Sequence, residues 1–423
     1  MYFWYKFLTY LFYPFAPIYL YLRKLKKKED PKRYIEKLSN INLKRDNGFL
    51  IWIHVASVGE AMSILPIIEE FIKEKKIDQV LLTSITVSSG SILEKRYSQN
   101  PKVIHQFLPL DIPILIKKFL NHWKPNLTIF IDSEIWPNLI FEIHNNEIPL
   151  LLINGRITEK TFKRWRLVIN FARKIFSKFD LCIASNKESE KFLQILGASK
   201  TKNYGNLKFS QTKTSSNKEL DASFLKKIKN RKIWCAASTH ADEEILCAET
   251  HLKIKKNYNN VLTIIIPRHI NRAKQIITAI SKLNLNVALY SESDQIGRDT
   301  DILIIDSYGE SLKFYNISKN VFIGKSLVET LVKDSGQNPI EAARQGCKVF
   351  HGPNIRNFVE IYDYLQTLDV TKEVKNSDDL CSFLINEFKQ ERSKNDETIR
   401  KIENYGQNIF NNVILEIKKY IYK

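Results

Sequence analysis

The sequence predicts an α/β protein with two doubly wound parallel sheets. From about residue 48, short and nearly continuous apolar runs alternate with longer amphipathic stretches, which is typical of parallel strands covered by helices on both faces. A polar stretch at 202–220 interrupts this pattern, which then restarts. The length of 423 residues also exceeds what one ordinary core holds. We therefore expect two Rossmann-like domains that face a cleft, with ligands at the carboxyl ends of the strands.

The apolar runs place the expected strands in chain order. In the first half they are 48–55, 80–86, 127–132, 149–155 and 181–185. In the second half they are 232–238, 260–268, 286–291, 301–306, 320–326 and 347–353. Amphipathic stretches such as 61–75 and 160–176 supply helices between the strands. The expected division is an N-terminal anchor at 1–25, a basic linker at 26–47, domains at 48–205 and 206–400, and a C-terminal helix at 401–423.

The first 22 residues are apolar and aromatic, interrupted only by Lys6, and the basic stretch "RKLKKK" follows directly. A signal peptide would need a basic leading region and a small-residue cleavage site, and neither is present. The length suits a membrane-anchor helix that spans a bilayer. Pro14, Pro17 and the tyrosines suit a shallow interfacial anchor, and a hydrophobic helix packed on the domain is a third interpretation. The basic cluster places the body of an anchored protein on the cytoplasmic face.

The composition limits the partners and the chemistry. A net charge of +19 favours binding to polyanions. Lys, Ile and Asn are abundant throughout the chain, however, so a general compositional bias explains the charge equally well. Five scattered cysteines have no metal-ligand spacing, so we expect buried free thiols. "GKS" at 324–326 is not a P-loop because Lys319 stands where that motif needs glycine. No dinucleotide fingerprint or zinc motif is present, and no D-x-D pair lies at the end of an expected strand, so we expect no cofactor and no metal.

Unusual short motifs gather at the expected strand ends. They are "ASVGE" at 56–60, "DSEIWPN" at 132–138, "INGRI" at 153–157, "GNLKF" at 205–209, "ASTHADEE" at 237–244, "IPRH" at 266–269, "DSYGE" at 306–310, "SGQNPIEAA" at 335–343 and "HGPNIRNFVEI" at 351–361. The first contains Ser57-Val-Gly-Glu60, which fits a capping box that starts a helix. A helix N-terminus lowers the pKa of a carboxyl group. A catalytic Glu60 would therefore have to turn away from its own helix, with Gly59 supplying the backbone freedom.

In this order and spacing, the motifs resemble those of the 3-deoxy-D-manno-octulosonic acid (Kdo) transferase family of lipopolysaccharide synthesis. The resemblance covers essentially the whole chain and rests on S-V-G-E, E-I-W-P-N, G-N-L-K, S-T-H-x-x-E-E, P-R-H and N-P-x-E. It implies a two-domain GT-B glycosyltransferase fold at the cytoplasmic face of the bacterial inner membrane. It also implies transfer of Kdo from CMP-Kdo to a lipid A precursor (lipid IVA), by inversion and without a metal.

The resemblance implies roles for three reacting groups. Glu60 matches the general base, Glu134 matches a second important acidic residue, and Lys208 matches a lysine that stabilises the transition state. From the residues alone, Glu134 also suits a helix-start carboxylate ahead of Trp136-Pro137, and Lys208 suits a solvated linker lysine. Sugar transfer from a CMP donor needs a base and charge stabilisation, so these residue types fit the chemistry.

The donor is expected on three segments, matched by the family: Pro267 and Arg268; Tyr308, Gly309 and Glu310; and Asn338, Pro339, Ile340 and Glu341. Arginine binds phosphate or carboxylate in two-pronged fashion. Glycine allows a close approach of the backbone to the nucleotide. Asn338 and Pro339 suit the N-cap and first residue of a helix, which would place Glu341 at the third position, where resemblance favours ribose binding.

The sequence departs from the family beside this donor segment. Lys325 replaces the usual second glycine of G-G-S, Gln337 replaces the histidine of G-G-H-N, and the stretch 327–336 between them is longer than usual. These departures affect donor contacts, whereas all the proposed reacting groups are present. Two alternatives remain at this point: a membrane-associated GT-B transferase that uses another nucleotide sugar, and a basic protein that binds anionic membrane lipids or nucleic acid. The basic runs lack interleaved aromatic residues outside the N-terminus, so we expect no nucleic-acid partner.

Overall fold

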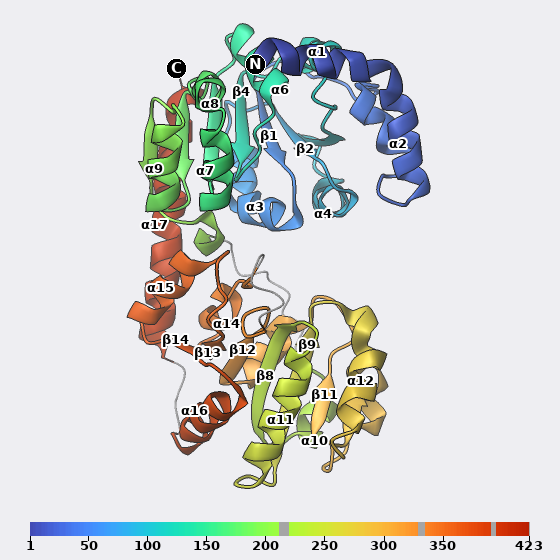
Figure 1. The fold of residues 1–423 in the computed structure, drawn as a ribbon, viewed down its shortest axis with the longest axis vertical. Coiled ribbons are helices and arrows are strands. Elements are labelled where there is room, and N and C mark those ends of the chain that lie inside the picture. Colours follow the sequence, from blue (N-terminus) through green and yellow to red (C-terminus); the bar gives the residue numbers. More distant parts are fainter. Residues whose placement is uncertain (211–219, 329–334, 391–394, 423) are drawn as a thin grey trace. The chain divides into compact units, whose positions relative to one another are not determined.

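The computed structural model describes residues 1–210, 220–328, 335–390 and 395–422. The chain divides into two compact units: unit 1 comprises Met1–Lys213 with Tyr405–Lys423, and unit 2 comprises Thr214–Asn404. Each unit contains a parallel sheet of seven strands flanked by helices (Figure 1). The predicted α/β architecture with two doubly wound sheets is therefore confirmed.

The sheet of unit 1 has the strand order β3-β2-β1-β4-β5-β6-β7. Its strands are β1 Leu50–Val55, β2 Gln79–Ser84, β3 Val103–Phe107, β4 Leu127–Ile131, β5 Leu150–Gly155, β6 Leu181–Ala184 and β7 Thr201–Asn203. The order reverses between β1 and β4, which pair in register with Ile53 opposite Ile129. Ligands of such sheets bind outside the carboxyl ends at this reversal. The ends of β1 and β4 carry the motifs that contain Glu60 and Glu134.

The helices of unit 1 cover both faces of its sheet. They are α3 Val58–Lys73, α4 Val87–Tyr97, α5 Pro113–Trp123, α6 Pro137–Asn145, α7 Glu159–Arg166, α8 Ile169–Phe176 and α9 Lys187–Ile195, with the short 3-10 helices η2 Arg33–Leu38 and η3 Leu207–Ser210. The helical stretch expected at 160–176 is broken, because Val168 leaves helical geometry at φ −128° and ψ 39°. The long helix α17, Asp396–Ile421, contributes its last part to unit 1, where Glu416 accepts a hydrogen bond from Lys202 Nζ at 2.7 Å.

The N-terminal segment does not form the expected membrane-anchor helix. It consists of α1 Tyr2–Phe12 and α2 Ala16–Leu25, eleven and ten residues long, with the 3-10 turn η1 Tyr13–Phe15 between them. Pro14 and Pro17 explain the break, because proline cannot donate the backbone hydrogen bond that continues a helix. Across the described residues, no helix combines the length and the apolar character needed to cross a membrane. A membrane-spanning helix is therefore not shown for this segment, and its association with a membrane surface stays a prediction.

The two N-terminal helices are attached to the body of unit 1. Tyr5 Oη donates to Asp111 Oδ2 at 2.8 Å, and Asn138 Nδ2 donates to Thr9 Oγ1 at 2.9 Å. Tyr2 stacks on Phe141 with ring centroids 3.9 Å apart. Ala16 and Leu20 of α2 are buried. One side of this segment is therefore packed against the domain.

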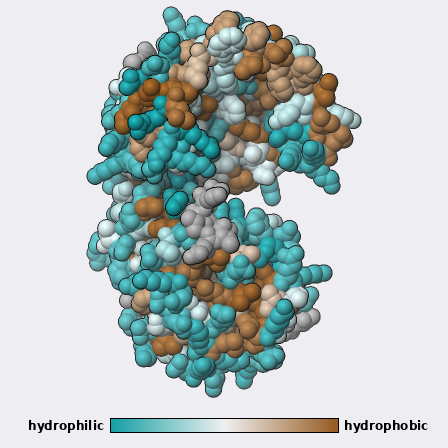
Figure 2. Space-filling model, in the orientation of Figure 1, coloured by the Kyte–Doolittle hydropathy of each residue, from teal (hydrophilic) through white to brown (hydrophobic). Residues whose placement is uncertain are grey.

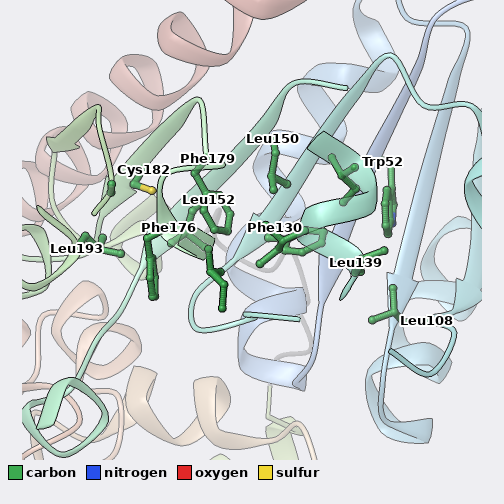
Figure 3. Close-up of a cluster of buried hydrophobic side chains, with 14 of the residues drawn as sticks. Trp52, Leu108, Phe130, Leu139, Leu150, Leu152, Phe176, Phe179, Cys182 and Leu193 are labelled. Atoms are coloured by element: carbon green, nitrogen blue, oxygen red, sulfur yellow. The ribbon is translucent and has the colours of Figure 1, made fainter. Parts of the chain in front are cut away.

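The core of unit 1 lies between the sheet and the helices α5, α6 and α8 (Figure 3). Trp52, Phe130 and Leu152 project from three neighbouring strands, and Leu139 and Phe176 meet them from helices. All five side chains are at most 1% exposed. Burial on this scale is the main stabilising contribution to such a domain. The five cysteines of the chain are buried free thiols, as predicted.

The sheet of unit 2 has the order β10-β11-β9-β8-β12-β13-β14. Its strands are β8 Lys232–Thr239, β9 Val261–Pro267, β10 Val287–Leu289, β11 Ile302–Ile304, β12 Asn320–Ile323, β13 Lys348–His351 and β14 Thr371–Glu373. Its helices are α10 Ala222–Lys227, α11 Glu243–Lys255, α12 Ala273–Ser281, α13 Ser311–Ile317, α14 Ile340–Arg344, α15 Val359–Thr367 and α16 Ser377–Lys389, with the 3-10 turns η4 Ile270–Arg272 and η5 Tyr290–Gln295. The ends of β9, β8 and β12 are neighbours, and this edge carries the predicted donor residue Arg268.

Candidate active site

Glu60 lies on the first turn of α3, directly after β1. Ser57 is the N-cap of α3, and its Oγ accepts a hydrogen bond from the Glu60 N–H at 3.3 Å. In return, the Glu60 carboxylate accepts from the Ser57 hydroxyl at 2.9 Å and from the Ala56 N–H at 2.7 Å. The predicted helix cap is confirmed. The expectation that a reactive Glu60 turns away from its own helix is wrong, since the carboxylate folds back over the first turn.

The Glu60 carboxyl group nevertheless has a raised pKa, at about 7. Burial is the largest cause, and the negative charges of Asp132 and Glu134 add to it. The hydrogen bonds from Ala56 and Ser57 oppose this rise, but they do not outweigh it. A carboxyl group with this pKa is poised to accept a proton near neutral pH.

Gly59 does not have the role expected of it. Its φ is not positive, so the turn does not require glycine for backbone freedom. A Cβ placed on Gly59 would meet only Ser57 Oγ, at 4.0 Å. The space around Gly59 is therefore open, and neither its backbone nor its packing requires a glycine there.

Glu134 follows β4 and lies beside the end of β1. Its Oε2 accepts from Trp136 Nε1 at 2.8 Å and is 3.2 Å from His54 Nε2. It does not cap α6, because the N-cap is Trp136 and no side chain caps that helix. The alternative interpretation of Glu134, as a carboxylate that only starts a helix, is therefore not supported.

A buried polar chain lies behind Glu134. His54 is fully buried in β1, its Nδ1 is 2.9 Å from Thr83 Oγ1, and Thr83 Oγ1 accepts from Trp52 Nε1 at 2.8 Å. An ionised carboxylate only accepts hydrogen bonds, so a neutral His54 must carry its proton on Nε2, facing Glu134. The Thr83 hydroxyl then donates to Nδ1. Sequence reasoning missed His54 and Thr83, although two polar residues in buried strands were a usable signal.

Lys208 lies close to Asp132, which also follows β4. Burial raises the pKa of Asp132, and the positive charges of Lys208 and Arg156 oppose this rise without cancelling it. Lys208 sits in η3, which packs against α3. Asn154, at the end of β5, fixes this turn by accepting the Leu207 N–H at 2.9 Å. Lys208 is partly buried and interacts with an acidic side chain, which does not favour its interpretation as a solvated linker lysine.

Unit 1 thus gathers all three predicted reacting groups at one edge of its sheet. The negative charges of Glu134 and the additional carboxylate Asp132 act on Glu60, and the positive charge of Lys208 acts on Asp132. Asp132 was not predicted as a site residue. Its φ of 61° is left-handed, a region that aspartate tolerates better than most residues other than glycine. Within the described residues, no group of three His, Cys, Asp or Glu side chains is arranged to hold a metal ion.

The predicted donor residues of unit 2 lie on two parts of its strand edge. Pro267 ends β9, and Arg268 follows it with an exposed side chain. Tyr308 is 70% exposed, and Gly309 has φ 82° with no atom within 4 Å of a built Cβ. Glu310 is the N-cap of α13 and pairs with Lys313. Glycine is needed at 309 for its φ, and the space around it is open.

The third donor segment forms a helix start that differs from the expectation by one residue. Pro339 is the N-cap of α14, and the Asn338 side chain accepts the Ile340 N–H at 3.1 Å. Glu341 is therefore the second helical residue, with an exposed side chain. Proline fixes φ near the helical value, which makes it compatible with both positions. Pro339 already has helical φ and ψ values of −86° and −8°, and the Asn338 side chain accepts the N–H two residues later, as an N-cap side chain does, so the predicted helix start agrees with the structure to within one residue.

Comparisons with known proteins agree with this architecture. The family model described as "3-Deoxy-D-manno-octulosonic-acid transferase (kdotransferase)" matches residues 28–211. A 3-deoxy-D-manno-octulosonic acid transferase of Rickettsia bellii is 33% identical over 96% of this chain and 93% of its own. A probable mitochondrial 3-deoxy-D-manno-octulosonic acid transferase of Arabidopsis thaliana is 32% identical over 86% of this chain and 82% of its own.

Solved structures with low identity show the fold. A putative UDP-N-acetylglucosamine 2-epimerase from Listeria monocytogenes is 14% identical and superposes with a TM-score of 0.61, covering 89% of this chain and 97% of its own. A glycosyltransferase from Rickettsia africae, 14% identical, gives a TM-score of 0.55 over 89% of this chain and 100% of its own. These neighbours support a GT-B-like fold. Together with the sequence relatives, they establish that the chain belongs to the 3-deoxy-D-manno-octulosonic acid transferase family of glycosyltransferases.

Proposed function

We propose that this protein transfers Kdo from CMP-Kdo to a lipid A precursor (lipid IVA), by inversion and with Glu60 as the base. The observation that carries the proposal is the Glu60 carboxyl group, half-buried beside Asp132 and Glu134 with a pKa of about 7. Membership of the transferase family supports the reaction class. The identity of the nucleotide, the acceptor and the mechanism are parts of this proposal.

The ionised Glu60 carboxylate takes the proton from an acceptor hydroxyl group. The oxygen then attacks the anomeric carbon of Kdo from the face opposite the nucleotide, and the bond to the CMP phosphate breaks with its electron pair on the phosphate oxygen. Inversion follows from this single displacement. Glu60 afterwards releases its proton to solvent, which restores the base.

Positively charged side chains stabilise the transition state and bind the donor. Lys208 stabilises negative charge that develops in the transition state, and Arg268 binds an anionic group of the donor. These cations supply the electrostatic stabilisation, so no step requires a metal ion. Glu134 acts on Glu60 through its negative charge, which raises the pKa of the base.

The N-terminal helices suit a protein that works at a membrane surface. Their exposed apolar residues include Phe3, Trp4, Phe7, Leu8, Leu11, Phe15, Ile18, Leu22 and Leu25, each at least half exposed. Figure 2 shows apolar side chains gathered over α1 and α2. Arg23 and Lys24 follow in the last turn of α2. We propose that this face lies in the interface of the bacterial inner membrane, on the cytoplasmic side, with basic residues near anionic lipids.

The decisive experiment incubates the purified protein with CMP-Kdo and a tetraacylated lipid A precursor. We expect release of CMP and a lipid that carries Kdo, and mass spectrometry of the product counts the Kdo residues. A Glu60→Gln variant is the matched control and should form neither product. Absence of both products with the wild-type protein would overturn the proposal.

A nucleotide comparison separates this proposal from a transferase that uses another nucleotide sugar. CMP should protect the wild-type protein against thermal unfolding, because a ligand that binds only the folded state stabilises it. UDP and GDP at the same concentration should give little protection. Protection by UDP alone would favour the other donor class.

A further inference from the structure

Lys325 follows β12 in unit 2, at the position of the second glycine in the G-G-S motif to which the sequence was compared. Its φ is 57°, in the left-handed region that glycine adopts readily and other residues rarely adopt. The preceding Gly324 cannot be replaced, since a Cβ there would lie 2.7 Å from the Thr239 Cα. Position 324 therefore requires glycine because a side chain would not fit there. At position 325, glycine is favoured only by the backbone conformation. The chain accepts local strain to place a lysine at this point.

A buried carboxylate holds Lys325 in this conformation. Glu243, with no exposed surface, accepts the N–H groups of Lys325 at 2.7 Å, Ser326 at 2.9 Å and Leu327 at 3.2 Å. The same carboxylate accepts the N–H of His240 at 3.0 Å. Four backbone donors on one carboxylate fix the turn rigidly and leave that carboxylate little capacity to neutralise a lysine side chain.

The same contacts bring Lys325 beside the predicted donor residue Arg268. His240 and Lys325 donate to one oxygen of Glu243, and the rings of His240 and His269 are 5.8 Å apart. Arg268 precedes His269, and its N–H donates to Thr239 at 3.0 Å. Three neighbouring strands, β9, β8 and β12, thus deliver Arg268, His240 and Lys325 to one edge. We call Lys325, Arg268, His240 and His269 the basic cluster.

Among the residues that the structure describes, the neighbouring carboxylates have other partners. Glu243 is occupied by backbone N–H groups, and Glu244 pairs with Arg272 at 2.9 Å. Within residues 220–328, 335–390 and 395–422, the side chains of Lys325 and Arg268 form no hydrogen bond and no ion pair. Burial lowers the pKa of His240 to about 4, and the positive charges of Lys325, His269 and Arg268 contribute. His240 is therefore neutral at pH 7, and Lys325 and Arg268 carry the fixed positive charge.

We propose that Lys325 is an additional anion-binding residue of the donor site, which together with Arg268 holds an oxyanion of the nucleotide sugar. This inference rests on the proposed function, because it takes the CMP-sugar as the ligand of unit 2. The oxyanion is either the phosphate of the nucleotide or the carboxylate of the sugar. Both present the oxygen atoms that an ammonium group and a guanidinium group bind well.

The test measures binding of CMP, cytidine and CMP-Kdo to the wild-type protein and to Lys325→Gly and Lys325→Gln. Lys325→Gly removes the charge and relieves the backbone, whereas Lys325→Gln removes only the charge. We expect both variants to keep the melting temperature within a few degrees and to bind the anionic ligand about tenfold more weakly. The affinity of the variants should also depend less on salt concentration.

Lys124→Gly is the matched control. Lys124 also has a left-handed φ, 42°, but it ends α5 in unit 1, so this variant makes the same residue change away from the cluster. It should leave binding unchanged.

The ligands identify the anion that Lys325 contacts. Weaker CMP binding with unchanged cytidine binding identifies the phosphate, and weaker CMP-Kdo binding with unchanged CMP binding identifies the carboxylate. If the wild type binds CMP and both Lys325 variants bind every ligand equally well, the assignment of Lys325 is wrong while the proposed function stands. If the wild type binds neither CMP nor CMP-Kdo, the proposed function fails and the assignment fails with it.

Discussion

Ser57 and Glu60 cap each other. The Ser57 hydroxyl donates to the Glu60 carboxylate at 2.9 Å, while the Glu60 N–H donates to Ser57 Oγ at 3.3 Å. The capping interaction and the raised pKa belong to the same carboxyl group. A helix cap and a general base are therefore compatible at this position, because burial and two neighbouring carboxylates outweigh the hydrogen bonds that favour ionisation.

Glu60→Gln separates the two roles. Glutamine is accepted at this position of a capping box, so the variant should fold with a free energy of unfolding within about 1 kcal/mol of the wild type at pH 5. Transfer should fall at least about a hundredfold, because an amide cannot take a proton. Circular dichroism melts and CMP release assays check the two parts. A variant that keeps most of its activity would return Glu60 to a purely structural role.

The stability difference between these two proteins should depend on pH. The folded-state pKa of Glu60 lies above its ordinary value, so the stability of the wild type is fully present below about pH 4.5 and decreases as the pH rises through about 7. Glu60→Gln lacks this loss. Because Glu60 is only half-buried, we expect the variant to gain roughly 1–2 kcal/mol relative to wild type between pH 5 and pH 8. Urea unfolding at both pH values measures the difference, and parallel curves would contradict the raised pKa.

The rate of transfer should report the same carboxyl group. A base with a pKa of about 7 is mostly protonated at pH 6 and mostly ionised at pH 8, so kcat/KM should rise about tenfold over this interval. Ser57→Ala removes a hydrogen bond that lowers the pKa of Glu60, so its rising limb should move to higher pH. The variant should also lose about 1 kcal/mol of stability with its N-cap. An unshifted limb in Ser57→Ala would show that another group controls the profile.

Sequence patterns predicted the central strands of both sheets and missed three of the four edge strands. The strands β3, β7 and β14, which lie at sheet edges, were not among the expected strands. Edge strands are short or polar, as in Thr201–Asn203 and Thr371–Glu373, so they lack the apolar runs that identify central strands. The expectation of one long N-terminal helix was wrong for another reason: apolar composition does not show where a helix ends, and Pro14 and Pro17 divide this segment into two helices.

The site was predictable in its residues and unpredictable in its contacts. The resemblance of the motifs to those of the transferase family indicated Glu60, Glu134 and Lys208, which unit 1 brings to one edge. The contact of His54 with Glu134 joins residues 80 positions apart, and the contact of Asn154 with Leu207 joins residues 53 apart. Such pairs depend on strand order and register, which local patterns do not encode. The direction of the Glu60 side chain likewise depends on the balance between capping and burial.

Replacement of His54 should impair catalysis through Glu134. His54→Gln removes the Nε2 donor near Glu134 and leaves the Thr83 hydroxyl without its ring partner, so we expect a loss of about 1–3 kcal/mol in stability. The rate kcat should fall about tenfold to a hundredfold because Glu134 loses its orientation, while the KM for donor should change little.

His251 supplies a matched control for this variant. It is equally buried in unit 2, with Nδ1 2.8 Å from Thr263 Oγ1 and Nε2 3.2 Å from Asp301 Oδ1. His251→Gln should therefore lose similar stability and keep kcat per folded molecule. Equal loss of kcat in both variants would show that His54 acts only through stability.

Membrane binding should depend on α1 and not on exposed leucine in general. Leu8 in α1 and Leu415 in α17 are 60% and 59% exposed, so serine at either position should leave the folded state almost unaffected. Burial of a leucine side chain contributes about 1.5–3 kcal/mol, so Leu8→Ser should weaken binding to vesicles that contain anionic phospholipid by about tenfold or more. Leu415→Ser should bind like the wild type. Co-sedimentation across a range of lipid concentrations measures both affinities. If the two variants bind equally well, α1 does not lie in the lipid interface, and the acceptor lipid must reach Glu60 without that contact.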